Sequence, residues 1–290
     1  MAGNGKVINR VFSRKVIEEL VDTGHNSVFT SVITRHISDP TSKTYGQIIS
    51  EIYCYLGESN RNEYYYTNTL LNKLLVGKHN VNTTTALSQV RIGAHIADFV
   101  MINGEGCVYE IKSDLDNFER LSDQLYDYFK AFSKVSVLAP DHGRERVAKM
   151  LDSLGEWGEA VGIYGLTEND TIFSRTNERK PKEYNDFLDY RCIFTLLRKR
   201  EYEHILYDYF GSLPVVPPVF YYKECLKMFE MIPISEAQRM TFKELKKRNR
   251  ITRTDFQSIP SELKAVTYFT GLAKKIPNIE NLWQRQYREE

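Results

Sequence analysis

Three charged residues have the types and spacing needed for phosphodiester hydrolysis. Glu110 and Lys112 lie two positions apart in the segment YEIKSD (109–114), and Asp98 precedes them. Residues i and i+2 of a strand point to the same face, so Glu110 and Lys112 would share one side of a sheet. Burying a carboxylate beside an ammonium is costly unless the two groups are paired or used. The pair is therefore either a salt bridge on an exposed sheet face or part of a catalytic site.

A β-hairpin would bring Asp98 to the same place. The residues NGEG at 103–106 have the composition of a hairpin turn, and CVYEIKS (107–113) would be the returning strand. Two carboxylates at a strand end suit Mg²⁺, which prefers oxygen ligands and keeps several of its waters. A metal held there would polarise a phosphate and acidify a bound water. A lysine beside it can orient that water and stabilise the charge that develops on the phosphate.

The segment that must position these residues alternates between helical and strand patterns. From residue 59 to 176 the order is helix, strand, strand, helix, strand, helix, strand, which predicts a mixed α/β sheet flanked by helices. The stretch 83–102 forms one strand or a strand pair, and a helix that ends at Gly77 precedes it. The helix over 116–132 is expected to begin at Asp116, with Glu119 at the capping-box spacing.

The chain as a whole divides into three predicted regions. Residues 1–58 form a small helical segment, 59–176 the α/β core, and 177–290 a mainly helical region. In the first region, two helices are expected to end at Gly24 and at Gly57. In the third, one long helix or two precede the break PVVPPVF (214–220), and shorter helices follow it.

Composition excludes several classes of protein. With 42% apolar and 27% charged residues the chain has an ordinary globular composition. Its four cysteines form no CxxC pair, which argues against a zinc site or a disulfide framework. No apolar stretch is long enough to span a membrane, and the first residues lack the apolar core of a signal peptide. We therefore expect a cytoplasmic protein that has no membrane partner.

A net charge of +1 does not indicate a nucleic-acid-binding protein, but one segment is locally basic. From Arg239 to Arg253, seven basic residues accompany a single acidic one, Glu244. Such a run either contacts phosphates or forms a solvated helix face. The candidates for contact with nucleic acid are Lys243, Lys246, Lys247, Arg248 and Arg250.

Asp98 with Glu110-Ile111-Lys112 resembles the motif of the PD-(D/E)xK nuclease superfamily, and the order of elements over residues 60–166 is similar to its core. Gln124 and Tyr128 match the QxxxY pattern of the RecB-like and Cas4-like branch. Residues at i and i+4 lie on one helix face, so both can face the site.

A closer resemblance covers about residues 60–250. The stretches YEIKSDLDNFERLSDQ, FSKVSVLAP and EWGEAVGIYGL are similar to a bacterial and phage family of PD-(D/E)xK-like proteins. Two positions depart from the pattern. Ala97 replaces the proline that often precedes the aspartate, and Trp157 stands alone where relatives often have two tryptophans.

The resemblance implies a restriction-endonuclease-like fold and a Mg²⁺-dependent nuclease, a hydrolase in which Mn²⁺ can replace Mg²⁺. DNA is the expected substrate over RNA, and the expected product carries a 5′-phosphate. Lys112 would position the attacking water, while Gln124 and Tyr128 would orient Lys112 or touch the nucleic-acid backbone. The metal ligands it implies are Asp98, Glu110, the backbone carbonyl of Ile111 and, as a further candidate, Glu63.

Two other functions remain open. The protein could be a catalytically silent module that keeps the nuclease fold to hold nucleic acid or a partner protein, the latter through its C-terminal helical region. It could also be a structural phage or host protein with no affinity for metal. The presence of Asp98, Glu110 and Lys112 together argues against a silent site, which would be free to lose Lys112.

Overall fold

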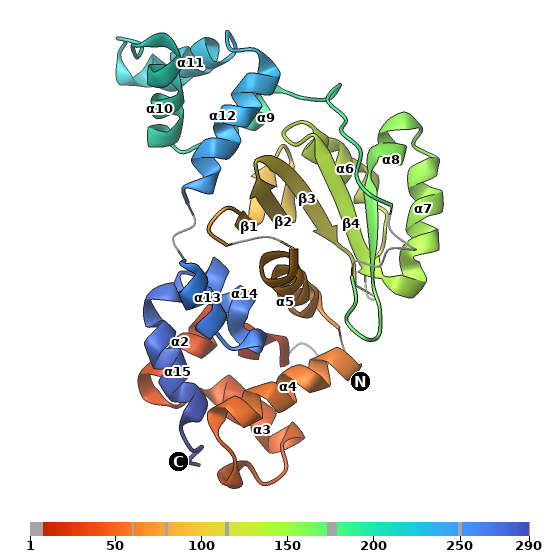
Figure 1. The fold of residues 1–290 in the computed structure, drawn as a ribbon, viewed down its shortest axis with the longest axis vertical. Helices are drawn as coiled ribbons and strands as arrows, with labels where there is room; N and C mark the ends of the chain where they lie inside the picture. Colours follow the sequence, from red (N-terminus) through yellow and green to blue (C-terminus); the bar gives the residue numbers. More distant parts are fainter. Residues whose placement is uncertain are drawn as a thin grey trace. The chain divides into compact units, whose positions relative to one another are not determined.

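The chain folds into two compact units in a computed structural model (Figure 1), which describes residues 8–59, 61–78, 81–113, 116–172, 179–248 and 251–289. Unit 1 comprises residues 1–82 and 251–290, and unit 2 comprises residues 83–250. The two ends of the chain thus contribute to the same unit. This division differs from the three consecutive regions expected from the sequence, because contacts join segments that are distant along the chain.

Unit 2 is built on a five-stranded mixed sheet. The strands are β1 (Thr85–Ile92), β2 (His95–Asn103), β3 (Glu105–Ile111), β4 (Lys134–Pro140) and β5 (Gly162–Leu166), and they lie side by side in this order. The pairs β1–β2 and β2–β3 are antiparallel, and the pairs β3–β4 and β4–β5 are parallel. The predicted α/β class is confirmed, and the stretch 83–102 forms a strand pair.

Helix α6 (Leu121–Phe129) packs against β2 and β4, and it buries Leu125 and Phe129 in the same core as Val108 and Val137. Odd-numbered residues of β3 face the other way, where the ring of Tyr109 lies 5.9 Å from that of Phe99. Helix α7 (Arg144–Asp152) packs against β5 and is followed by the short helix α8 (Glu156–Ala160). The even-numbered face of β3, which carries the candidate site, is therefore turned toward α6.

The remaining helices of unit 2 follow the sheet. Helices α9 (Tyr190–Thr195) and α10 (Lys199–Phe210) replace the single long helix that was one of the two expectations. The break lies before Arg198, whose backbone N–H donates to the Glu201 carboxylate at 2.7 Å and so begins a new helix. Helices α11 (Pro218–Phe229) and α12 (Ile234–Lys246) complete the unit, and α12 packs against β2 and β3.

Unit 1 is helical, and its two segments are interleaved. The first contributes α2 (Arg14–Thr23), α3 (Ser27–His36), α4 (Tyr45–Ser59) and α5 (Glu63–Asn72), and the second contributes α13 (Arg253–Ser258), α14 (Lys264–Phe269) and α15 (Ile276–Gln284). Helix α15 packs against α2 and α4, and α14 packs against α5 (Figure 1). The backbone N–H of Tyr45 donates to the carbonyl of Arg285 at 3.0 Å. Within the described ranges, no helix has the length and apolarity needed to cross a membrane.

Helix boundaries show where local sequence signals were sufficient and where they were not. Gly24 ends α2 as predicted, in a left-handed conformation with φ of 81°. Gly57 does not end α4, which runs on to Ser59; a Cβ at Gly57 would lie 2.7 Å from the Tyr65 hydroxyl oxygen, so this glycine permits close packing. Gly77 likewise lies within a π-helical turn, Lys73–Lys78, that continues α5.

The predicted start of α6 at Asp116 is wrong. The helix begins at Leu121, and Asp116 instead accepts two hydrogen bonds of 2.7 Å, from the backbone N–H and the hydroxyl of Ser113. Aspartate readily closes turns in this way, and a carboxylate engaged by its own loop cannot also cap a helix that begins five residues later.

Gly158 is expected to tolerate no side chain. A Cβ at this position would lie 2.1 Å from the backbone carbonyl oxygen of Leu151, which cannot move without shifting α7. Gly158→Ala should therefore lower the free energy of unfolding by about 2 kcal/mol or more, as measured by urea denaturation. Gly143→Ala is the matched control, since its Cβ would meet nothing nearer than 3.9 Å and should leave stability nearly unchanged. Equal stability of the two variants would contradict the packing described for α8.

Candidate active site at the end of strands β2 and β3

The β2–β3 ladder stops where two carboxylates come together. Its recorded pairs run from Asn103 opposite Glu105 to Phe99 opposite Tyr109, and the same register places Asp98 opposite Glu110. Residues opposite each other on antiparallel strands project to the same face. The structure thus brings the two predicted carboxylates side by side on the face that α6 covers.

Asp98 ends the ladder with its own side chain. Its Oδ2 accepts the backbone N–H of Ile111 at 2.9 Å, where a carbonyl of β2 would otherwise be the acceptor. The N–H and C=O of one strand residue point to the same side, so the carbonyl of Ile111 also leaves β3 on the side of Asp98. Oxygen groups of Asp98, Glu110 and Ile111 therefore lie at this strand end. Their role as metal ligands stays a prediction.

Glu110 is buried and receives three hydrogen bonds. Its side chain is 2% exposed. Its Oε1 accepts from Lys112 Nζ at 2.9 Å and from Gln124 Nε2 at 2.6 Å, and its Oε2 accepts from the Tyr128 hydroxyl at 2.7 Å. Lys112 Nζ also donates to Gln124 Oε1 at 2.9 Å. The Glu110–Lys112 pair is therefore buried and belongs to a closed network, which excludes the simple salt bridge on an exposed face.

This network leaves bonding capacity on both charged groups. A carboxylate has about four acceptor sites and an ammonium has three donors. The three bonds to Glu110 and the two from Lys112 are the only ones found for these side chains among the described residues. One acceptor site on Oε2 and one N–H of Lys112 thus remain for other groups. The first suits a cation and the second an anion.

Tyr128 acts as a hydrogen-bond donor. Its hydroxyl lies 2.7 Å from Glu110 Oε2 and 2.9 Å from the carbonyl oxygen of Ile96, and its side chain is fully buried. Burial raises the pKa of Tyr128 far above its usual value, and the negative charges of Glu110 and Asp98 raise it further. The phenol therefore stays protonated. Tyr128 thus holds Glu110 rather than Lys112. The expected role of Tyr128 in orienting Lys112 or touching the nucleic-acid backbone stays a prediction.

A second cluster, which we call the clamp, joins α6 to the turn between β1 and β2. It consists of Asp127, Ala94, His95 and Lys130, and the sequence alone assigned it no role. Asp127 Oδ2 accepts from the backbone N–H of Ala94 at 2.9 Å and lies 2.7 Å from His95 Nδ1, while Oδ1 accepts from Lys130 Nζ at 2.6 Å. A Cβ at Gly93 would lie 2.8 Å from the Asp127 carboxyl carbon. Helical spacing is the sequence feature that could have revealed this cluster. Asp127 follows Gln124 by three positions, so the two side chains lie on the same face of α6.

The charges around Asp127 shift two pKa values. Burial alone would raise the pKa of Asp127, but hydrogen bonds from Lys130, His95 and Ala94 outweigh it and hold the pKa below its usual value. The hydrogen bond to Asp127 raises the pKa of Lys130 in turn. The clamp therefore contains an ionised carboxylate at neutral pH and fixes the start of β2 against α6.

Glu63 belongs to a different unit from the other candidate ligands. It is the exposed first residue of α5 in unit 1, whereas Asp98, Glu110 and Lys112 belong to unit 2. Asn62 caps the helix through its side chain, which accepts the Tyr65 N–H at 2.8 Å. A carboxylate in the first turn is stabilised by the helix dipole. The proposal that Glu63 is a metal ligand stays a prediction.

The basic run is less available than its sequence suggested. Arg248 Nε donates to Glu201 at 2.7 Å, and Lys247 pairs with Glu244. Lys243 and Lys246 have no acidic partner among the described residues, and Arg250 lies outside them. Two of the five predicted phosphate contacts are therefore already engaged within unit 2.

The donor set at the strand end fits a small hard cation. Two carboxylates and one ammonium leave a net charge of −1, and Mg²⁺ accepts few protein oxygens because water completes its shell. No group of three or more His, Cys, Asp or Glu side chains suited to a metal occurs in the part of the chain that the structure describes. A cation here would be held by Asp98, Glu110 and the Ile111 carbonyl.

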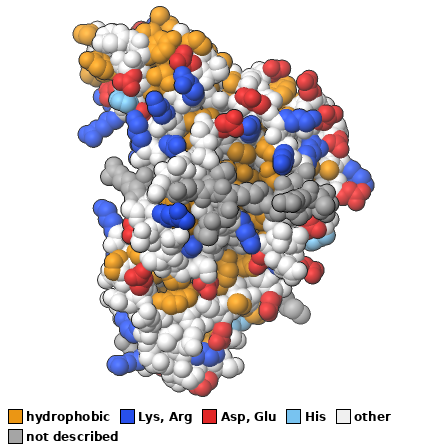
Figure 2. All heavy atoms as spheres, in the orientation of Figure 1, with side chains coloured by type: hydrophobic (Ala, Val, Ile, Leu, Met, Phe, Trp, Pro, Cys, Tyr) orange, Lys and Arg blue, Asp and Glu red, His pale blue; other side chains and the backbone are white. Residues whose placement is uncertain are grey.

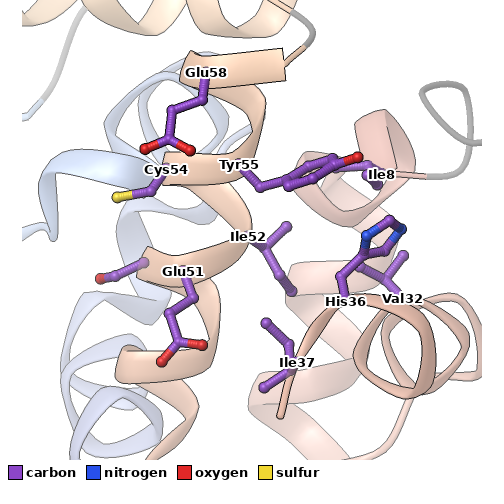
Figure 3. A pocket seen from close by; sticks show the side chains of 10 residues that line it. Ile8, Val32, His36, Ile37, Glu51, Ile52, Cys54, Tyr55 and Glu58 are labelled. Atoms are coloured by element: carbon purple, nitrogen blue, oxygen red, sulfur yellow. The ribbon is translucent and has the colours of Figure 1, made fainter.

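Unit 1 contains a separate hollow between α3 and α4, with a volume of about 350 Å³. Figure 3 shows Ile52 and Tyr55 directed toward His36 and Val32, while Glu51, Cys54 and Glu58 form the other flank of α4. The pKa of the Cys54 thiol is raised, first by burial and then by the surrounding glutamates, so this thiol is a poor nucleophile at neutral pH. The acidic rim of this hollow disfavours phosphate groups.

Asp127→Asn should reveal the ionised clamp through its pH dependence. Because the native pKa lies below the unfolded value of about 3.9, ionised Asp127 stabilises the fold above that value and loses its effect as pH falls through the native pKa. We expect the variant to lose about 2 kcal/mol at neutral pH, with a smaller difference from wild type in acid, by denaturation at several pH values. Asp123→Asn, an exposed position on the same helix, should have little effect at any pH. A pH-independent loss would contradict the ionised state of Asp127.

Comparison with known proteins places the chain in a family. No curated protein and no solved structure shows significant similarity to it. The protein-family model described as Bacteriophage P4 protein cII matches residues 57–267, which is more than half of the chain and includes the sheet and the candidate site. The chain therefore belongs to the bacteriophage P4 protein cII family.

Proposed function

We propose that the protein is a metal-dependent nuclease of the PD-(D/E)xK type that hydrolyses phosphodiester bonds, with DNA as its substrate. The observation that carries the proposal is the buried network in which Glu110 meets Lys112, Gln124 and Tyr128 beside Asp98. The order of elements agrees with the resemblance, since α5 is followed by three antiparallel strands, α6 and the parallel strand β4.

The oxygen groups of Asp98, Glu110 and Ile111 are the proposed cation ligands. When bound, a divalent cation would polarise the scissile phosphate and lower the pKa of a water that attacks it. Asp98 already fixes one of its oxygens on the Ile111 N–H, and Tyr128 fixes Oε2 of Glu110. Both carboxylates are thus held in place by the fold before any ligand arrives, which limits the reorganisation that binding would require.

Lys112 is the group proposed to act on substrate. Two of its N–H bonds are directed to Glu110 and Gln124, so the ammonium is fixed and its third N–H remains as a donor. A phosphate oxygen or the attacking water can accept that bond, and the ammonium then opposes the negative charge that develops on the phosphate. Gln124 acts through Lys112 and is therefore a positioning residue.

A silent binding module is the second candidate, and one observation favours it. The network around Glu110 satisfies a buried carboxylate with three donors from the chain itself, and such a network can stabilise a fold without any metal. The two candidates differ in one measurable response: the nuclease cleaves its substrate when metal is present, and the silent module does not.

Cleavage assays with the full chain separate the two. Linear, circular, single-stranded and duplex DNA, and RNA, would each be incubated with Mg²⁺, Mn²⁺ or EDTA. We expect metal-dependent cleavage of DNA that leaves 5′-phosphate ends, and a loss of at least about 100-fold in rate for Asp98→Asn and Lys112→Met. Asn keeps an oxygen for the Ile111 N–H, so Asp98→Asn removes charge with little change in shape.

Lys134→Met is the matched control for Lys112→Met, because Lys134 lies on β4 and pairs with Glu105 at the surface. It should retain full activity. Calorimetry with Mn²⁺ completes the design. Metal binding without cleavage of any substrate would support the silent module, and absence of both would indicate a structural protein. Equal cleavage by wild type and both site variants would show that the activity comes from elsewhere.

A further inference from the structure

The tip of the α10–α11 hairpin carries an apolar surface that none of the described residues of unit 2 covers. Of the eleven exposed large hydrophobic side chains found among the described residues, six form what we call the apex patch. They are Tyr207, Tyr209, Val215, Val219, Phe220 and Tyr222. Figure 2 shows apolar side chains gathered over the part of unit 2 that contains these helices. Isolated exposed apolar residues need no explanation, but a contiguous group does.

The exposed area of the patch approaches what one partner contributes to a protein interface. Val215 is 99% exposed, Val219 79% and Tyr207 60%. At about 150–200 Å² for a whole large side chain, the six residues together expose roughly 600 Å². This matches the upper end of what a monomer commonly exposes in one patch. It also supplies most of the ~800 Å² that each partner contributes to a stable protein interface.

The core of unit 2 supports the helices that carry the patch. Helices α10 and α11 use their inner faces in the core, where Cys225 and Phe229 are fully buried. The ring of Phe194 lies 4.7 Å from that of Tyr202 and 5.2 Å from that of Tyr222. The connection between the helices contains Pro214 and Pro217, and Pro218 begins α11; the rings of these prolines fix their φ angles. A partner would therefore bind a preformed surface with little ordering cost.

The charge of the patch narrows the choice of partner. The stretch from Tyr209 to Tyr222 contains no Asp, Glu, Lys or Arg, and Asp208, which precedes it, lies 3.5 Å from His204 Nε2. Nucleic acid needs cations for its phosphates, and anionic membrane surfaces likewise attract Lys and Arg, so neither fits. In a two-fold symmetric contact each patch meets its own copy, and a charged patch would repel itself. The charge-free stretch 209–222 avoids this repulsion, so the greater part of the patch can pack against its own copy.

We propose that the apex patch is a two-fold symmetric interface through which two copies of this chain associate. The contact pairs the α10–α11 tip of one copy with that of the other. It is independent of the proposed nuclease activity, since none of its residues belongs to the network around Glu110.

Sedimentation equilibrium of the full chain between about 1 and 100 μM tests the proposal. We expect a monomer–dimer equilibrium with a dissociation constant in the micromolar range or tighter, within the span seen for interfaces of this size. Val215→Asp and Phe220→Asp should each raise that constant at least tenfold, because symmetry introduces two charges into one apolar contact.

Val215→Asp should fold like the wild type, because a side chain that is 99% exposed makes no contribution to the core. A change in its dimer affinity therefore reports on the contact itself. Tyr55→Asp is the matched control, since Tyr55 is an exposed large apolar residue of unit 1 that lies outside the patch. It should leave the equilibrium unchanged, and circular dichroism would check the fold of every variant. A wild type that remains monomeric at 100 μM overturns the proposal, and so does a dimer whose affinity neither aspartate changes.

Discussion

The buried carboxylate of Glu110 is the constraint on which the arrangement of unit 2 depends. A charge that is 2% exposed must be matched by donors, because an unpaired buried charge costs more than a small domain can supply. Its donors come from Lys112, directly after β3, and from two successive turns of α6. The distance between helix and sheet and the rotation of the helix about its axis are thereby fixed at one point. The clamp of Asp127 on the β1–β2 turn fixes them at a second point.

At the end of the β2–β3 ladder, Asp98 likewise links the fold to the candidate chemistry. A sheet can open between two strands only if the backbone groups that lose partners find others. Asp98 performs this function for Ile111, and the same side chain lies next to Glu110 in the register. The feature that ends the ladder therefore also concentrates negative charge. Structure and candidate chemistry depend on the same carboxylate, so substitutions that keep an oxygen at Asp98 separate the two better than alanine does.

Much of this site was predictable because its spacings are local. Glu110 and Lys112 share a face through the two-residue period of a strand, and Gln124 and Tyr128 share one through the turn of a helix. The NGEG turn set the hairpin register. Contacts that do not follow the regular spacing of a strand or helix escaped prediction. Asp116 was engaged by a loop serine, Gly57 served packing against Tyr65, and Arg248 was paired with Glu201. No local pattern indicated that residues 251–290 would join the first 82 in one unit.

That discontinuity has a consequence for synthesis on the ribosome. Residues 83–250 form one continuous stretch with the larger share of the chain, so unit 2 is complete in sequence before the last helices of unit 1 have been translated. Domains generally fold as units and in the order in which they emerge. The N-terminal helices must therefore wait, with the apolar surface that α14 and α15 will cover still exposed, until those two helices leave the exit tunnel. A chain cut short between residue 250 and the start of α14 would carry an intact sheet and a first unit that cannot close.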